Sequence, residues 1–189
     1  MRKHLSSALV FFVLLLPFSA TWANKYDDTI KIFKGAGESA SYFDHSYGYA
    51  VFPSIGKAGV GIGGAHGSGR VYAGGKPVGE TSMTQVTVGW QLGGQVYSQI
   101  IFFKDERAFN EFTGGNFEFG AQATAVAITA GVSAGASTAG GTQAGASGGK
   151  HDAATAGGYH KGMAVFTVAK GGLMYEASIG GQKFNYTPL

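Results

Sequence analysis

Apolar and polar residues alternate with a period of two in the middle and C-terminal parts of the chain, which is typical of β-strands. Val86, Val88 and Trp90 alternate with polar or small residues and predict a half-buried strand. Residues 96–103 are apolar on both faces, so we expect a central strand that is covered on both sides. A further alternation over residues 173–179 predicts another strand.

Glycine pairs separate these strand-like segments. Each pair suits a tight hairpin turn, because glycine adopts positive φ without steric cost. We therefore expect a meander of antiparallel strands. The pairs are Gly74-Gly75, Gly93-Gly94, Gly171-Gly172 and Gly180-Gly181.

The segment ahead of the strands has helical spacing. Over residues 25–34, Tyr26, Ile30 and Phe33 recur at the intervals of one helix face, which predicts a short amphipathic helix. A further helical turn is expected within residues 38–45. The ordered chain should therefore begin with helix and continue with strands.

A second helix is predicted between two strands, over residues 104–112. Ala108, Phe109 and Phe112 would face inward there. Asp105 lies at the start of this helix, where the helix dipole favours negative charge. This placement gives the carboxylate a sufficient structural role.

The combined elements predict a mainly β (α+β) fold. We expect an antiparallel strand meander with a short N-terminal helix and one further helix near residues 104–112. Many short strands need protected edges, so the sheet should curl into a barrel or a sandwich.

A low-complexity stretch interrupts the strands after about residue 134. Between residues 129 and 149, only Val132 and Gln143 are not Gly, Ala, Ser or Thr. Such a stretch buries too little apolar surface to offset its conformational entropy. We therefore expect a Gly/Ala/Ser/Thr loop at about residues 135–159.

The first residues have the layout of a secretory signal peptide. A basic start is followed by an apolar run to Ala20 and by a small-x-small site that ends at Ala23. We expect cleavage after Ala23, so that residues 1–23 are a signal peptide and residues 24–189 form one domain. The alternative is a retained anchor, although the run is short for a spanning helix, which needs about 20 apolar residues.

Charge and cysteine content exclude several classes of function. Loss of Arg2 and Lys3 would leave 12 basic residues against 11 acidic ones, a net charge of +1. A general nucleic-acid binder carries a clear basic excess, so no nucleic-acid partner is expected. The chain has no cysteine, which excludes disulfides and thiolate sites.

Two motif matches lack the flanks that their chemistry needs. Residues 59–64 match G-x-G-x-x-G but lead into another strand, where a dinucleotide site needs a helix. A glycine-rich strand that lets another backbone or a ligand approach closely explains them better. Residues 145–149 match G-x-S-x-G within low-complexity sequence, without the strand and helix of a nucleophile elbow. No metal site or cofactor is expected, because no histidine pair has helical ligand spacing.

Three separated blocks of sequence occur in the order seen in the SYLF domain family. They are residues 49–53 (YAVFP), 95–103 (QVYSQIIFF) and 169–184 (AKGGLMYEASIGGQKF). The chain resembles that family from about Tyr26 to Tyr186. The resemblance implies phospholipid binding without enzymatic activity. In eukaryotic SYLF proteins the N-terminal helix and nearby basic residues are thought to bind phosphoinositides, which implies such a role here.

The lipid-binding hypothesis assigns two groups of residues. Lys31 and Lys34 would contact head-group phosphates while the Ile30 and Phe33 face inserts, as in an interfacial helix. The alternative is an ordinary helix that packs on the sheet with its lysines in water. Three further cations at turns or strand ends are candidates for a phosphate-binding rim, or are solvated loop charges. These cations are Lys57, Arg70 and Lys170.

The expected function is therefore anionic phospholipid binding by an exported, periplasmic or cell-envelope-associated protein, which is not an enzyme. An acyl-chain pocket inside the sheet is an alternative mechanism, and a protein in the cell envelope is a further candidate partner. A second hypothesis is an outer-membrane β-barrel, which would fit the signal peptide and the strand content. A third is an enzyme whose carboxylates, such as Asp105 and Glu176, converge in a cleft.

Overall fold

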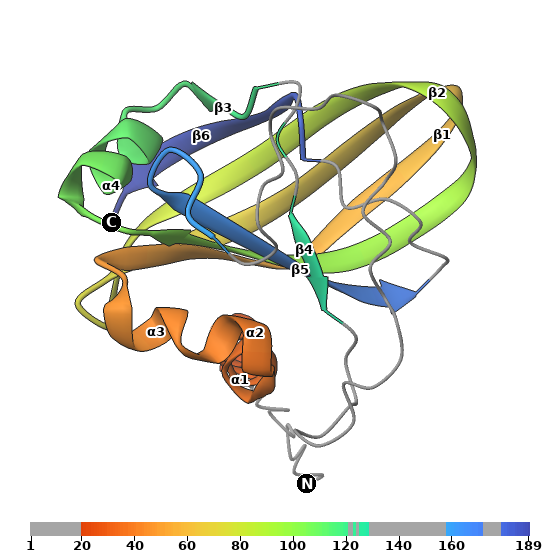
Figure 1. The fold of residues 1–189 in the computed structure, drawn as a ribbon. Coiled ribbons are helices and arrows are strands. Elements are labelled where there is room, and N and C mark those ends of the chain that lie inside the picture. Colours follow the sequence, from red (N-terminus) through yellow and green to blue (C-terminus); the bar gives the residue numbers. More distant parts are fainter. Residues whose placement is uncertain (1–19, 121–122, 124, 129–157, 172–178) are drawn as a thin grey trace, which may run out of the picture.

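The computed structural model describes residues 20–120, 123, 125–128, 158–171 and 179–189. These residues form four helices and six strands (Figure 1). The helices are α1 (Ala20–Gly35), α2 (Gly37–Ala40), α3 (Tyr42–His45) and α4 (Glu106–Thr113). The strands are β1 (Gly48–Ala73), β2 (Lys76–Phe103), β3 (Phe117–Glu118), β4 (Val126–Ile128), β5 (Met163–Gly171) and β6 (Gln182–Pro188).

The long strands β1 and β2 form one antiparallel hairpin, whose pairs run from Gly48 with Phe103 to Ala73 with Lys76. Gly74 and Gly75 make its turn with φ of 58° and 75°, as predicted. The predicted turn at Gly93-Gly94 is wrong. Both glycines lie inside β2 and pair with β1, because the continuous ladder extends the strand through them.

The remaining strands attach to β2, which confirms a mainly β, largely antiparallel fold. The first part of β2 pairs with β6 and the last part pairs with β5. The outer strands are β3 beside β6 and β4 beside β5, and β4 alone among the described pairs is parallel to its neighbour. The sheet curls, so that the two ends of the long hairpin face each other (Figure 1).

The curl brings the two halves of β1 into close contact. A Cβ at position 67 would lie 2.6 Å from Ile55 Cγ1 and 2.9 Å from the Ser54 carbonyl oxygen. A Cβ at position 69 would lie 2.8 Å from the Val51 carbonyl oxygen. Gly59 contacts the backbone of Gly63 in the same way near the bend. The interpretation of the glycine-rich stretch as a site of close backbone approach is therefore confirmed.

Two hydrophobic clusters cover the two faces of the last part of β2. The inner core lies within the curl and includes Phe52, Ile55, Met83, Ile101, Phe103, Phe112 and Phe184. The outer core lies between the sheet and α1 to α3 and includes Tyr26, Phe33, Val51, Ile100, Phe102 and Phe166. Ile100 to Phe103 are all 0% exposed, so the predicted central strand with two covered faces is confirmed for its last part, whereas Val96 at its start is 43% exposed.

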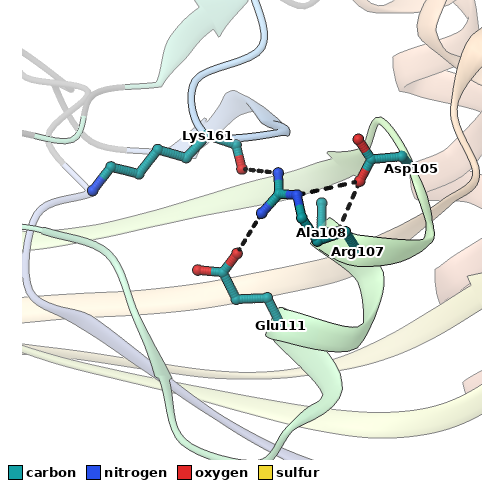
Figure 2. A network of polar contacts seen from close by, with 5 residues as sticks. All are labelled: Asp105, Arg107, Ala108, Glu111 and Lys161. Carbon is teal, nitrogen blue, oxygen red and sulfur yellow. Dashed lines mark hydrogen bonds and ion pairs between the residues drawn. The ribbon is translucent and has the colours of Figure 1, made fainter.

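The helix near residues 104–112 is also confirmed, as α4. The Asp105 carboxylate caps it by accepting from the Ala108 amide at 2.9 Å. Arg107 then joins the helix to a distant turn, as Figure 2 shows, by donating to Glu111 at 3.0 Å and to the Lys161 carbonyl oxygen at 3.2 Å. The structural role expected for Asp105 is thus observed.

The strand around residue 86 turns its apolar side chain to solvent and its polar side chain to the core, the reverse of what the sequence pattern predicts. Val86 is 70% exposed, whereas Gln85 is 2% exposed and donates to the Gly180 carbonyl oxygen at 2.9 Å. The predicted loop at about 135–159 and the predicted strand at 173–179 lie largely outside the described residues.

A buried polar group lies within the inner core. Gln99 and Gln182, both 0% exposed, exchange two side-chain hydrogen bonds at 2.9 and 3.2 Å. Gln182 also donates to the Tyr97 hydroxyl at 3.3 Å. Burial raises the pKa of Tyr97 to about 12, and the Gln182 hydrogen bond opposes that shift. The group joins β2 to β6, so the curl is held by hydrogen bonds as well as by packing.

The close approach within β1 predicts a stability difference between two glycines. Gly67→Ala should lower the free energy of unfolding by about 1–3 kcal/mol, because the new methyl meets backbone and a buried side chain. Gly56→Ala, with nothing within 4 Å of its Cβ, is the matched control and should change stability by less than about 1 kcal/mol. Urea denaturation measures both, and equal effects would contradict the packing described.

Tyr97 predicts a pH dependence. Its pKa is raised in the folded state, so its contribution is complete below pH 10 and is lost as pH rises towards 12. The free energy of unfolding should fall by roughly 1 kcal/mol more between pH 9 and 11 in the wild type than in Tyr97→Phe. Denaturation at the two pH values measures this, and parallel losses in both proteins would count against the burial of the hydroxyl.

Candidate functional site

The apolar face of α1 is in contact with the sheet. Phe33 is 0% exposed and Tyr26 is 6% exposed, both within the outer core, and Ile30 packs beside them. The Ser39 hydroxyl donates to the Phe33 carbonyl oxygen at 2.6 Å and ties the end of α1 to α2. In this conformation Ile30 and Phe33 are not available for insertion, and the arrangement matches the alternative of a helix packed on the sheet.

The solvent side of α1 carries Lys31 and Ile32, which are neighbours in sequence, and Lys34 lies on the flank of the helix toward α3. Lys31 and Lys34 are exposed, and Ile32 is 40% exposed. The Lys31 ammonium lies 3.7 Å from the Asp28 carboxylate in an exposed pair, which is weak in water. The Lys34 ammonium lies 5.2 Å from the centre of the Phe43 ring. We call Lys31, Ile32 and Lys34 the exposed α1 surface.

Arg70 lies on β1 beside the start of α1 and is not a free loop charge. Its guanidinium carbon lies 4.5 Å from the centre of the Tyr26 ring, and its side chain is 23% exposed. The Glu80 carboxylate approaches it to 3.7 Å. Burial raises the pKa of the Tyr26 hydroxyl, and the charge of Arg70 opposes that shift. The sequence contains no local signal for this contact, because it joins residues 44 positions apart.

Lys57 and Lys170 lie on opposite faces of the sheet. Lys57 alternates with Gly56 and so shares the face of the buried Ile55. The Lys170 ammonium lies 3.5 Å from the Ser54 hydroxyl, on the other face. The structure therefore does not bring Lys57, Arg70 and Lys170 together into one rim.

The interior of the curl is occupied by the inner core and by the buried Gln99–Gln182–Tyr97 group. A cleft of about 380 Å³ beside Arg70 is lined largely by polar side chains. Among the described residues, the interior of the curl is therefore filled by packed side chains, and the cleft beside Arg70 lacks the apolar lining that an acyl chain requires.

The described residues contain no group of three or more metal-ligating side chains. Asp105 serves as a helix cap, and Glu176 and His151 lie outside the described residues. None of the described helices is long and apolar enough to cross a membrane.

Comparison with known proteins gives one family. A family model described as Ysc84, Las17-binding protein actin regulator, matches residues 84–186, which is more than half of the 189 residues. The match runs from within β2 to Tyr186 in β6 and contains two of the three blocks that suggested the resemblance. A search of curated proteins found no match. The chain therefore belongs to the Ysc84 family, the SYLF domain family of lipid-binding and actin-regulating proteins.

Proposed function

We propose that this protein binds anionic phospholipid surfaces without catalysing a reaction, and that it does so through the exposed α1 surface. One observation carries the proposal: Ile32 is 40% exposed beside the exposed Lys31, with the exposed Lys34 on the flank, on a helix whose other face is anchored in the outer core. An apolar residue that enters the lipid boundary beside cations that meet phosphates is the usual interfacial arrangement. Membership of a family of lipid-binding domains supports it.

The helix binds while it stays docked on the sheet. Phe33 is 0% exposed, and removing such a ring from the core costs about 3–5 kcal/mol. Two lysines near an anionic surface contribute about 2 kcal/mol together. The free energy that the two lysines contribute at the surface is smaller than the cost of removing Phe33 from the core. Contact through the exposed side is therefore favoured over release of the Phe33 face.

The binding is expected to be weak and sensitive to salt. Two cations and one partly inserted isoleucine supply only a few kcal/mol, which gives reversible attachment. Asp27 and Asp28 lie on the same helix and reduce the local positive charge. Added salt screens what remains, since the Debye length is about 8 Å at physiological ionic strength.

Export to the periplasm or the cell envelope is part of the proposal. Residues 1–23 have the layout of a signal peptide. Because α1 begins at Ala20, cleavage after Ala23 removes only its first residues and keeps Tyr26 and Phe33. Mass spectrometry of the protein recovered from the producing cell should find Asn24 as the first residue, and an intact Met1 would contradict export by cleavage.

Charge reversal tests the exposed α1 surface. Lys31→Glu/Lys34→Glu should weaken co-sedimentation with anionic vesicles by at least about 2 kcal/mol, or roughly thirtyfold, because two attractive charges become repulsive. Lys76→Glu/Lys104→Glu, with the same charge change at two other exposed lysines, is the matched control. An equal loss in the control would show that only net charge matters, and retained binding in the first variant would contradict the site.

Neighbouring residues on α1 separate docking from insertion. Phe33→Ala should lower the free energy of unfolding by about 3–5 kcal/mol, whereas Ile32→Ser should leave it nearly unchanged. Ile32→Ser should nevertheless weaken vesicle binding, because Ile32 is the residue that reaches the lipid. Denaturant unfolding and vesicle binding of both variants measure this. Undiminished vesicle binding by Ile32→Ser would contradict the docked orientation.

A further inference from the structure

The cleft beside Arg70 is built from three adjacent strands and one helix. It lies between Tyr26 of α1 and the outward face of β1, β2 and β6, with a volume of about 380 Å³. Residues paired across antiparallel strands share a face, so the ladder places polar side chains in two rows across the three strands. The rows are Arg70–Glu80–Thr187 and Ser68–Ser82–Asn185, and all six residues line the cleft.

Arg70 has a hydrogen-bond interaction with the Tyr72 hydroxyl, but one of its donors has no partner. Its Nε atom is buried and has no hydrogen-bond partner. The Glu80 carboxylate, which is 63% exposed, lies 3.7 Å from Arg70 Nη2, which is beyond hydrogen-bond range. The Tyr26 ring at 4.5 Å holds the guanidinium in place. A buried donor without a partner is costly, so an anion that reached Nε would be stabilised.

The lining indicates the rest of the ligand. A guanidinium binds phosphate through parallel N–H donors. The hydroxyls of Ser68, Ser82 and Thr187 and the Asn185 carboxamide donate to or accept from ligand hydroxyls. We propose that this cleft binds the phosphate ester of a small polyol, with the phosphate on Arg70 and the polyol hydroxyls on the Ser68–Ser82–Asn185 row.

Such a ligand has two sources: a free polyol phosphate, or a phospholipid head group of the same chemistry. Only the second rests on the proposed function, because only it requires a membrane surface. Glu80 competes with the phosphate for Arg70, so removal of the Glu80 charge should strengthen binding.

The Arg70 Nε–H resonance reports on this cleft directly. Glycerol phosphate added to the ¹⁵N-labelled protein should shift that resonance saturably, because the buried donor gains an acceptor. Inorganic phosphate should bind roughly tenfold more weakly, since it lacks hydroxyls for the second row. No saturable shift, or equal affinity for both compounds, would overturn the proposal.

Two isosteric variants keep the test independent of folding. Glu80→Gln should tighten glycerol phosphate binding by up to about fivefold, because it removes an exposed competing charge. Asn185→Asp should weaken it by at least about fivefold, because it adds an anion to the second row. Lys31→Gln/Lys34→Gln, outside the cleft, is the control and should leave this affinity unchanged. Unaltered affinity in both cleft variants would place the anion elsewhere and overturn the assignment.

Vesicles distinguish the two sources. Phosphatidylglycerol and phosphatidylserine carry the same net charge, but only the first presents a polyol phosphate. Preference for phosphatidylglycerol that Asn185→Asp abolishes would support the cleft as a head-group site. Equal binding to both lipids together with the glycerol phosphate shift would support the free ligand. Loss of all vesicle binding with the shift retained would contradict the proposed membrane function and leave the cleft assignment supported.

Discussion

The approach of the two halves of β1 is the constraint on which the rest of the structure depends. A side chain at Gly67 or Gly69 would meet the opposite half of the strand, so the hairpin closes only because both positions lack a Cβ. Closure creates the inner core between the two halves and leaves an outer face for the helices. The same closure lets the buried Gln99–Gln182 pair join β2 to β6, which a flat hairpin would leave in water.

The functional surfaces follow from that closure. Because the outer face is free to receive a helix, α1 buries Phe33 and Tyr26 against it and presents its other side to solvent. Tyr26 also packs on Arg70, so the helix that carries the exposed α1 surface forms one wall of the polar cleft. The two proposed sites thus share one helix but use different sides of it.

Local patterns predicted those elements whose environment is set by neighbours in sequence. The apolar run at 96–103, the periodic helix near 104–112 and the Gly74-Gly75 turn were predicted for this reason. The strand at Gly93-Gly94 was not predicted, because pairing with β1 overrides the turn preference of the two glycines. Helical spacing put Phe33 on an apolar face of α1 but does not distinguish a sheet from a lipid as its cover. The Arg70–Tyr26 contact and the separation of Lys57 from Lys170 depend on tertiary structure, so no local pattern encodes them.

A single label on α1 tests the central claim, that this helix meets lipid with its exposed side. The chain has no cysteine, so Ile32→Cys gives one attachment point for a polarity-sensitive fluorophore. Contact of Ile32 with lipid should give a blue shift with anionic vesicles and none with neutral vesicles, and no shift for the same label at Lys76→Cys. A label at position 32 that stays in water while the protein co-sediments with anionic vesicles would show that α1 does not meet lipid with its exposed side.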